Sequence, residues 1–173
     1  MEKVILVDEN DKNIGLEEKV KAHLDEGKLH RAFADFIFNK KGELLIQQRS
    51  EKKMLWPLIW DNTCASHPRE NESYEKAGER RLLDELGFTC KLKMADKFQY
   101  HAAYKDVGAE SEVCATLIGE YDGDVKPVKE EVADWKWVNI NDLKKDMEEN
   151  PDKYTPWFII ALERLESLNT ISN

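Results

Sequence analysis

Three histidines and two glutamates are the residues of this chain whose types best suit chemistry. They are His23 and His30 in one short segment, His67 in Ser-His-Pro, and Glu110 and Glu112 in Glu-Ser-Glu. A lone histidine is more often a satisfied polar residue, and no pair here has a zinc-finger spacing. Imidazole nitrogens together with carboxylate oxygens nevertheless suit a divalent cation such as Zn²⁺, Mn²⁺ or Fe²⁺. We therefore predict that these five residues form a metal site.

The composition limits the partners that such a site can serve. The chain has 173 residues and a net charge of −9, which argues against nucleic-acid binding because no positive field would hold the phosphates. No apolar run approaches the roughly 20 residues that a bilayer span needs. The first eight residues predict a short strand and not a signal peptide. Three unpatterned cysteines favour a reduced, cytoplasmic protein.

The pattern of the chain predicts one domain over residues 1–173, because no repeat or linker interrupts it. Strands are expected at 4–8, 31–39, 43–49, 113–121 and 134–138, and Lys40-Lys41-Gly42 predicts a hairpin. Residues 15–24 fit either a helix or an irregular segment. Residues 56–60 predict a rigid aromatic loop.

Three helices are expected between and after these strands. Residues 72–86 form the clearest one, with Leu82, Leu83 and Leu86 as its apolar flank and Gly87 as its stop. A second runs from Asn141, as its cap, to residue 149 before a proline. The third carries a stripe that consists of Trp157, Ala161, Leu165 and Leu168. The expected fold class is α/β (α+β), with a mixed β-sheet sandwiched between helices.

Residues 66–88 carry a spaced pattern of acidic and basic side chains. Glu72 lies six residues after Ser66, Arg80 lies eight after Glu72, and the segment ends in DELGF at 84–88. This resembles the Nudix box, a loop–helix–loop that binds diphosphate through Mg²⁺. Arg81 stands where the box normally has a glutamate. A helix would place Arg81 and Glu85 one turn apart, where a solvated ion pair is the alternative reading.

The segments around this box resemble one branch of the Nudix superfamily, the type 1 isopentenyl-diphosphate isomerases. They are LHRAF at 29–33, IFNKKG at 37–42, QR at 48–49, WPLIWDNTCASHP at 56–68 and ESEVC at 110–114. An arginine at position 81 also fits this branch. The similarity runs from about residue 4 to the C-terminal helix.

The resemblance implies a role for each candidate residue. The five His and Glu residues named first would hold a divalent metal (Zn²⁺, Mn²⁺ or Mg²⁺), and Glu85 would bind a second cation, Mg²⁺, on the diphosphate. The residues expected to grip the diphosphate are Lys19, Arg49, Lys53 and Arg81. The partner would be a small prenyl diphosphate, bound by a monomer or a weak homodimer.

Glu112, Tyr100 and Trp157 are the expected catalytic residues. Moving a double bond by one carbon requires a proton to be added at one carbon and another removed nearby, through an unstable tertiary cation. This chemistry needs a strong positioned acid and the exclusion of water. Glu112 supplies a carboxyl group, and the face of Trp157 can stabilise a cation. Without the resemblance, Trp157 would be read as a core residue of the last helix.

Ala65 departs from the resembled family, which carries a catalytic cysteine at this position. Cys64 is one residue too early, and in an extended segment it would face away from Ala65 and His67. Two other functions therefore stay open. One is a Nudix diphosphate hydrolase, against which Arg81 counts. The other is a prenyl-diphosphate-binding protein with weak or no isomerase activity.

Overall fold

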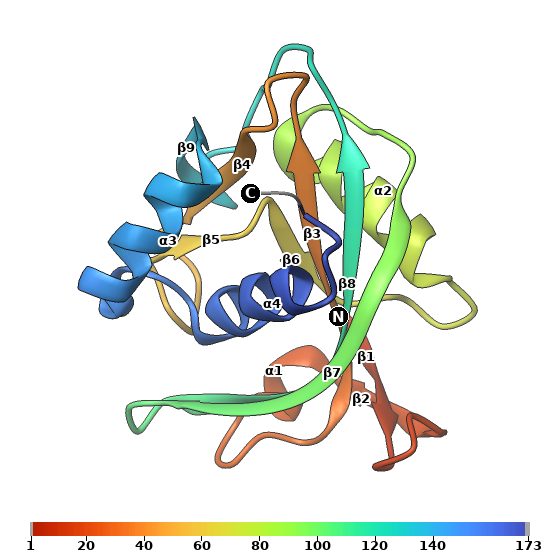
Figure 1. Ribbon diagram of the computed structural model, residues 1–173. Helices are drawn as coiled ribbons and strands as arrows, with labels where there is room; N and C mark the ends of the chain where they lie inside the picture. Colours follow the sequence, from red (N-terminus) through yellow and green to blue (C-terminus); the bar gives the residue numbers. More distant parts are fainter. Residues whose placement is uncertain (1, 172–173) are drawn as a thin grey trace.

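The fold is a mixed β-sheet with helices on both faces, described for residues 2–171 by a computed structural model (Figure 1). In chain order the elements are β1 (Lys3–Val7), β2 (Asn13–Glu18), α1 (Lys19–Ala22), β3 (His30–Phe38), β4 (Leu44–Arg49), β5 (Trp60–Asp61), β6 (Cys64–Ser66), α2 (Tyr74–Leu86), β7 (Lys93–Tyr104), β8 (Gly108–Glu120), β9 (Val132–Val138), α3 (Ile140–Glu149), the 3₁₀ turn η1 (Pro151–Lys153) and α4 (Pro156–Ser167). This architecture confirms the predicted fold class.

Strand β3 is the centre of the sheet. It pairs antiparallel with β1, β4 and β6, and parallel with β8 over the register from His30↔Glu112 to Phe38↔Glu120. Strand β7 runs antiparallel to β8 along almost its whole length. β3 is a nearly continuous apolar run because helices cover both faces of the sheet at this point.

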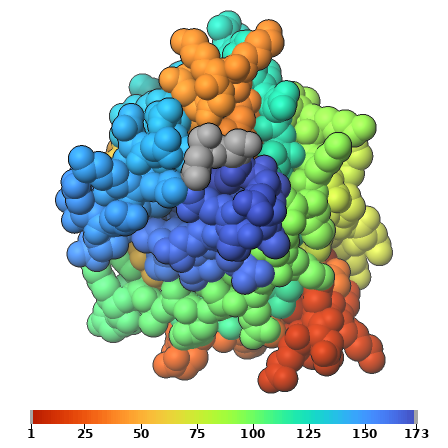
Figure 2. All heavy atoms as spheres, viewed as in Figure 1, coloured from red at the N-terminus to blue at the C-terminus, as the bar shows by residue number. Residues whose placement is uncertain are grey.

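The two faces of the sheet bury separate cores. One core lies beneath α3 and α4 and contains Phe36, Trp157 and Phe158, and the other lies beneath α2 and contains Phe33, Leu82 and Leu86. Figure 2 shows α4 lying between α3 and β7 on one face of the molecule. Since side chains alternate along β3, each of its faces supplies one of these cores.

Helix α2 begins and ends with regular caps. The Ser73 side chain accepts a hydrogen bond from the Lys76 N–H, and Gly87 takes a left-handed φ of 73°, which glycine adopts without strain. The prediction of Gly87 as the stop is confirmed. The predicted apolar flank is wrong at Leu83, which is 56 % exposed, because a step of one residue turns it away from the buried Leu82.

The two C-terminal helices differ from the prediction at their ends. Asn139, and not Asn141, caps α3, since the Asn139 side-chain oxygen accepts hydrogen bonds from the backbone N–H groups of Asn141 and Asp142. Helix α4 buries Trp157 as expected, but Leu168 is 51 % exposed because it lies at the C-cap, beyond the packed turns. Within residues 2–171, no helix is both long and apolar enough to span a bilayer.

Several strands escaped prediction because their sequences lack a strong apolar alternation. β2 and β7 are rich in charged residues, and β5 and β6 are very short. Strand β8 begins at Gly108, five residues before its predicted start, and therefore includes both Glu110 and Glu112. Residues 15–24 form the end of β2 followed by the single turn of α1.

Candidate functional site

The five predicted metal ligands converge from four segments of the chain. His23 follows the single turn of α1, His30 opens β3, His67 follows β6, and Glu110 and Glu112 lie in β8. One donor atom from each residue lies within 4.8 Å of all the others, and all five residues are buried. The sequence prediction that these residues lie together is therefore confirmed.

The backbone brings α1 against β8 at one tight contact. The Ala109 N–H donates to the His23 carbonyl at 2.9 Å, and a Cβ at Gly108 would lie 2.1 Å from that carbonyl oxygen. Glycine is thus required at position 108. In the parallel register of β3 and β8, His30 lies beside Glu112, so strand pairing alone sets this second contact.

Backbone carbonyls fix the orientation of two histidines. The Nδ1 atom of His23 lies 2.6 Å from the Lys19 carbonyl, and that of His30 lies 2.6 Å from the Lys28 carbonyl. A carbonyl only accepts hydrogen bonds, so Nδ1 carries the proton and the Nε2 lone pair is left to bind a cation. His23 Nε2 lies 2.9 Å from Glu110 Oε2, and His30 Nε2 lies 3.4 Å from Glu112 Oε1.

The donor set fits a divalent cation. Among residues 2–171, the buried atoms His30 Nε2 and Glu110 Oε2 have no partner with hydrogen-bond geometry, and His67 Nε2 lies 3.1 Å from Glu112 Oε1. Buried polar atoms are normally satisfied, and lone pairs that converge without a donor of their own are what a cation would satisfy. The cluster is therefore suited to bind a metal.

The pKa values of this cluster's members are shifted in different directions. Burial acts to raise the pKa of Glu112, but the nearby imidazole of His30 and the hydrogen bond from the Tyr100 hydroxyl hold it below its ordinary value. Burial likewise acts to lower the pKa of His23, yet Glu110 holds it above its ordinary value. Burial lowers the pKa of His67 well below its usual range.

Tyr100 is tied directly to Glu112. The two residues are cross-strand partners on β7 and β8, and the Tyr100 hydroxyl donates to Glu112 Oε2 at 2.5 Å. Burial, followed by the negative charge of Glu112, raises the pKa of Tyr100 well above its usual range. The hydroxyl therefore remains protonated, and it holds one oxygen of Glu112 in a fixed position.

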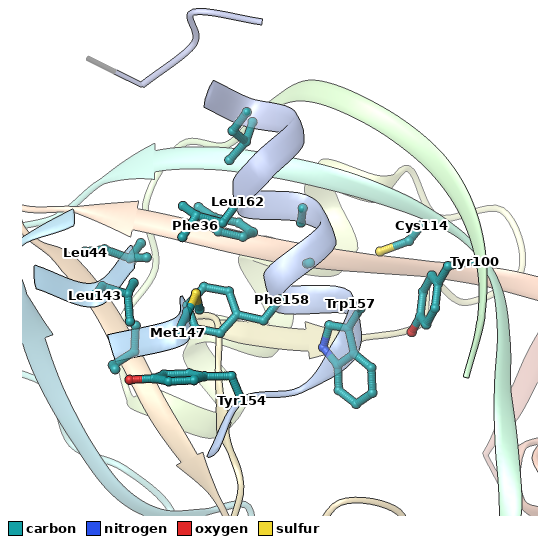
Figure 3. Close-up of a cluster of buried hydrophobic side chains, with 14 of the residues drawn as sticks. Phe36, Leu44, Tyr100, Cys114, Leu143, Met147, Tyr154, Trp157, Phe158 and Leu162 are labelled. Atoms are coloured by element: carbon teal, nitrogen blue, oxygen red, sulfur yellow. The ribbon is translucent and has the colours of Figure 1, made fainter. Parts of the chain in front are cut away.

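These residues line a cavity of about 320 Å³ that also has an apolar part. Its apolar and aromatic lining includes Ala32, Leu55, Tyr100, Cys114 and Trp157. Figure 3 shows Tyr100, Cys114 and Trp157 beside one another near the start of α4. The cavity thus joins a polar, metal-suited end to a wall suited to a small hydrocarbon.

The basic residues predicted to bind an anion are paired with acidic side chains. Lys53 and Arg81 both bond Glu131, and burial opposed by these two cations leaves the pKa of Glu131 lowered to about 2. Lys19 Nζ lies 3.1 Å from Glu2. An entering anion would have to share or replace these carboxylate partners.

The structure places most predicted site residues on the cavity wall and a few behind it. Those on the wall are Lys19, His23, Arg49, Lys53, His67, Tyr100, Glu110, Glu112 and Trp157. His30 is fully buried and is the one member of the metal-suited His and Glu cluster that does not line the wall. Arg81 donates to Glu85 one turn along α2, as predicted, and reaches the wall through Glu131.

Cys64 faces away from the cavity, as its place in an extended segment predicted. It packs in the core beneath α2, and burial raises the pKa of its thiol well above the usual range. Ala65 pairs with Ala34 of β3 and lines the cavity. Cys114 also lines this cavity, although the sequence analysis gave it no role.

Sequence reasoning missed two acidic residues at the site. Glu131 lies far along the chain from Lys53 and Arg81, so only the fold reveals their contact. Asp61 is fully buried next to Trp157 and Arg49. The one available signal was that Asp61 directly follows the aromatic segment 56–60. A charged residue beside buried aromatic side chains needs buried partners.

The fold is shared with solved structures of low sequence similarity. The DR0079 protein of Deinococcus radiodurans superposes with a TM-score of 0.75 at 18 % identity, covering 99 % of this chain and 100 % of that one. A MutT NUDIX hydrolase of Burkholderia pseudomallei gives a TM-score of 0.58 at 18 % identity, covering 79 % of this chain and 97 % of that one. At these identities the likeness concerns the fold alone.

The sequence of this chain matches the NUDIX domain family over residues 28–158, so fold and site define a NUDIX domain protein. An isopentenyl-diphosphate Delta-isomerase of Burkholderia multivorans is 42 % identical over 163 residues, covering 94 % of this chain and 92 % of its own. Isopentenyl-diphosphate Delta-isomerase 1 of Photorhabdus laumondii is 43 % identical over 160 residues, covering 91 % of each. The chain belongs to the isopentenyl-diphosphate Delta-isomerase family.

Proposed function

We propose that this protein interconverts isopentenyl diphosphate and dimethylallyl diphosphate. The observation that carries the proposal is a single cavity in which Glu112, fixed by Tyr100, and the indole of Trp157 are both on the wall. The curated relatives named as isopentenyl-diphosphate Delta-isomerases support the same reaction. A prenyl diphosphate is the small-molecule substrate.

The proton movements define what the residues have to do. A proton is added to C4, the terminal carbon of the alkene, and a different proton leaves C2, the CH₂ group attached to C3. The double bond thus moves from C3–C4 to C2–C3, and no atom is lost. The carboxyl group of Glu112 is the proton carrier that we assign, because it is buried and held by Tyr100. The π-face of Trp157 stabilises the intervening tertiary cation.

The diphosphate is assigned to the cationic end of the cavity. Lys19, Arg49 and Lys53 lie on its wall, and Arg81 lies directly behind Glu131. In a chain with a net charge of −9, such a cluster is a local site for an anion. Mg²⁺ held by Glu85 would offset the charge that Glu85 and Glu131 present to the diphosphate.

The His and Glu cluster is assigned to a second divalent metal, Zn²⁺, Mn²⁺ or Mg²⁺. When bound, this ion would supply a fixed positive charge that makes a neighbouring carboxyl group a stronger acid. His23, His30 and His67 would hold it by nitrogen, and Glu110 and Glu112 by oxygen. The mixed N and O donor set admits several metals.

The test is a proton NMR time course with purified protein, isopentenyl diphosphate and Mg²⁺ in D₂O. Growth of dimethylallyl methyl signals with deuterium incorporation is the expected result. Release of inorganic phosphate or diphosphate would instead identify a hydrolase, which Arg81 disfavours. An unchanged spectrum accompanied by ligand-dependent thermal stabilisation would identify a binding protein, and either of these outcomes overturns the proposal.

A further inference from the structure

Asp61 is a fully buried carboxylate that lies directly behind the catalytic cavity. It ends the short strand β5 and faces the first turn of α4, where Thr155 and Trp157 are located. It is not on the cavity wall, so it does not touch the substrate. A buried charge is costly unless its surroundings are arranged to hold it.

Four donors converge on this carboxylate. The Trp157 Nε1–H and the Thr155 hydroxyl each donate to Asp61 Oδ1 at 2.8 Å, and the Asn62 N–H donates to the same atom at 2.9 Å. Arg49 Nη1 donates to Oδ2 at 3.1 Å. These four neighbours all donate, which favours the ionised form of Asp61 and opposes the burial that raises its pKa above the ordinary value.

Arg49 is itself held in place on the other side. Its Nε donates to the Trp56 carbonyl at 3.0 Å and its Nη2 to the Leu55 carbonyl at 2.9 Å. The guanidinium carbon lies 5.2 Å from the centre of the Trp157 ring. Arg49 therefore anchors Asp61, and Asp61 in turn fixes the edge of the Trp157 indole.

A carboxylate that accepts a hydrogen bond from an indole N–H also changes the charge distribution of the ring. The hydrogen bond to a carboxylate moves electron density toward the π-face, and a cation near that face is then attracted more strongly. We propose that Asp61 is a positioning residue that orients and polarises Trp157 for the cation formed in the reaction. This inference rests on the proposed isomerase activity.

The test is a double-mutant cycle between Asp61→Asn and Trp157→Phe, with kcat as the readout. Asparagine keeps the shape of the side chain and removes its charge. We expect Asp61→Asn to lower kcat at least about tenfold in the natural chain, but less than about twofold in the Trp157→Phe background. The same loss in both backgrounds, or no loss in the natural chain, would overturn the inference.

Thr155→Val is the matched control, because it removes a donor from the same oxygen and leaves the indole bond in place. Its kcat is expected to stay within about threefold of the natural value. A loss as large as that of Asp61→Asn would show that kcat responds to any disturbance of the cluster. That result would overturn a specific action of Asp61 through Trp157.

Indole N–H resonances of the natural chain provide a second readout, and their exchange rate can be measured even if Asp61→Asn does not fold. The chain has five tryptophans, and Trp157→Phe identifies the Trp157 signal by its loss. In the natural chain this signal should lie downfield and exchange slowly with solvent, and in Asp61→Asn it should move upfield. Exchange as fast as in a free peptide would overturn the inference. Failure of the natural chain and of an Ala65→Cys chain to isomerise would instead overturn the proposed function.

Discussion

Ala65 stands at the position where the type 1 isomerases that this sequence resembles carry a cysteine. It lines the cavity from β6, while Glu112 lines it from β8, with β3 between the two strands. A thiol at position 65 would thus face the substrate from the side opposite Glu112. We expect Ala65→Cys to raise kcat by about 100-fold or more, since a positioned proton-transfer group typically contributes about 10²–10⁴-fold. Rates of dimethylallyl diphosphate formation measure this effect.

The matched control for this gain is a cysteine that points the other way. Cys64 is buried beneath α2, so Cys64→Ala should cost stability and leave the Ala65→Cys gain intact. If Cys64→Ala abolished isomerisation in the natural chain, Cys64 would be the proton carrier, and the placement of its side chain away from the cavity would be contradicted.

Asp35 is a second residue whose burial has a measurable consequence. Asp35 lies on β3 and its side chain is fully buried against α2. Neither carboxyl oxygen has a hydrogen-bond partner among residues 2–171. Burial, and then the charge of Glu85, raises its pKa well above the ordinary value. The folded state therefore binds a proton that the unfolded state releases above about pH 4.

This difference makes Asp35 lower the stability as the pH rises. The destabilisation is absent when the pH is below the pKa of Asp35 in the unfolded chain. It grows with pH until the pH reaches the raised pKa of Asp35 in the folded chain. Asp35→Asn should remove this slope, so the free energy of unfolding should fall less between pH 5 and pH 8 in the variant than in the natural chain. Urea unfolding of both proteins at the two pH values measures it. Parallel pH profiles would contradict the assigned protonation.

At the scale of elements, the contact between α1 and β8 sets the geometry of the metal-suited cluster. Gly108→Ala would place a methyl group 2.1 Å from the His23 carbonyl oxygen, so the two segments have to separate. We expect a loss of stability of about 1–3 kcal/mol and a Zn²⁺ affinity that is lower by at least about tenfold. Calorimetric titration with Zn²⁺ measures the second effect.

Gly42→Ala is the control for this substitution. Gly42 has a φ of +75°, and no atom of residues 2–171 lies within 4 Å of a Cβ at this position. Alanine there should cost about 1–2 kcal/mol from backbone strain alone. Its Zn²⁺ affinity should equal that of the natural chain. Equal losses of affinity in both variants would mean that general destabilisation, and not the α1–β8 contact, controls metal binding.

The elements that the sequence predicted well are those with strong local patterns. Helix α2 has a cap, an apolar pair and a terminal glycine, and β3 has a long apolar run. Strand β7 lacks a long apolar run because one side of it is exposed, yet it carries Tyr100 to Glu112. The ligand residues were identified by type and resemblance, whereas the partners Asp61 and Glu131 depend on long-range contacts that no local pattern encodes.

At the scale of the whole molecule, the metal-suited cluster joins parts of the chain that are far apart in sequence. His23 lies before the central strand, His67 after β6, and Glu112 in the neighbouring strand β8. These donors are brought together only in the folded state, since the unfolded chain has no reason to hold them within 4.8 Å of one another. A metal held by this cluster would therefore couple its binding to folding.

This coupling predicts a stabilisation by metal that depends on the cluster. At a free Zn²⁺ concentration about 100 times its Kd, the folded state should gain about 2.7 kcal/mol. For a chain of this size that gain corresponds to a rise in Tm of about 5–10 °C, which a chelator should reverse. His67→Ala should abolish the rise. His101→Ala should preserve it, because the half-exposed His101 ring bonds the Glu26 carbonyl outside the cluster. If both variants kept the full rise, the metal would be binding elsewhere, and the assignment of the His and Glu cluster would be wrong.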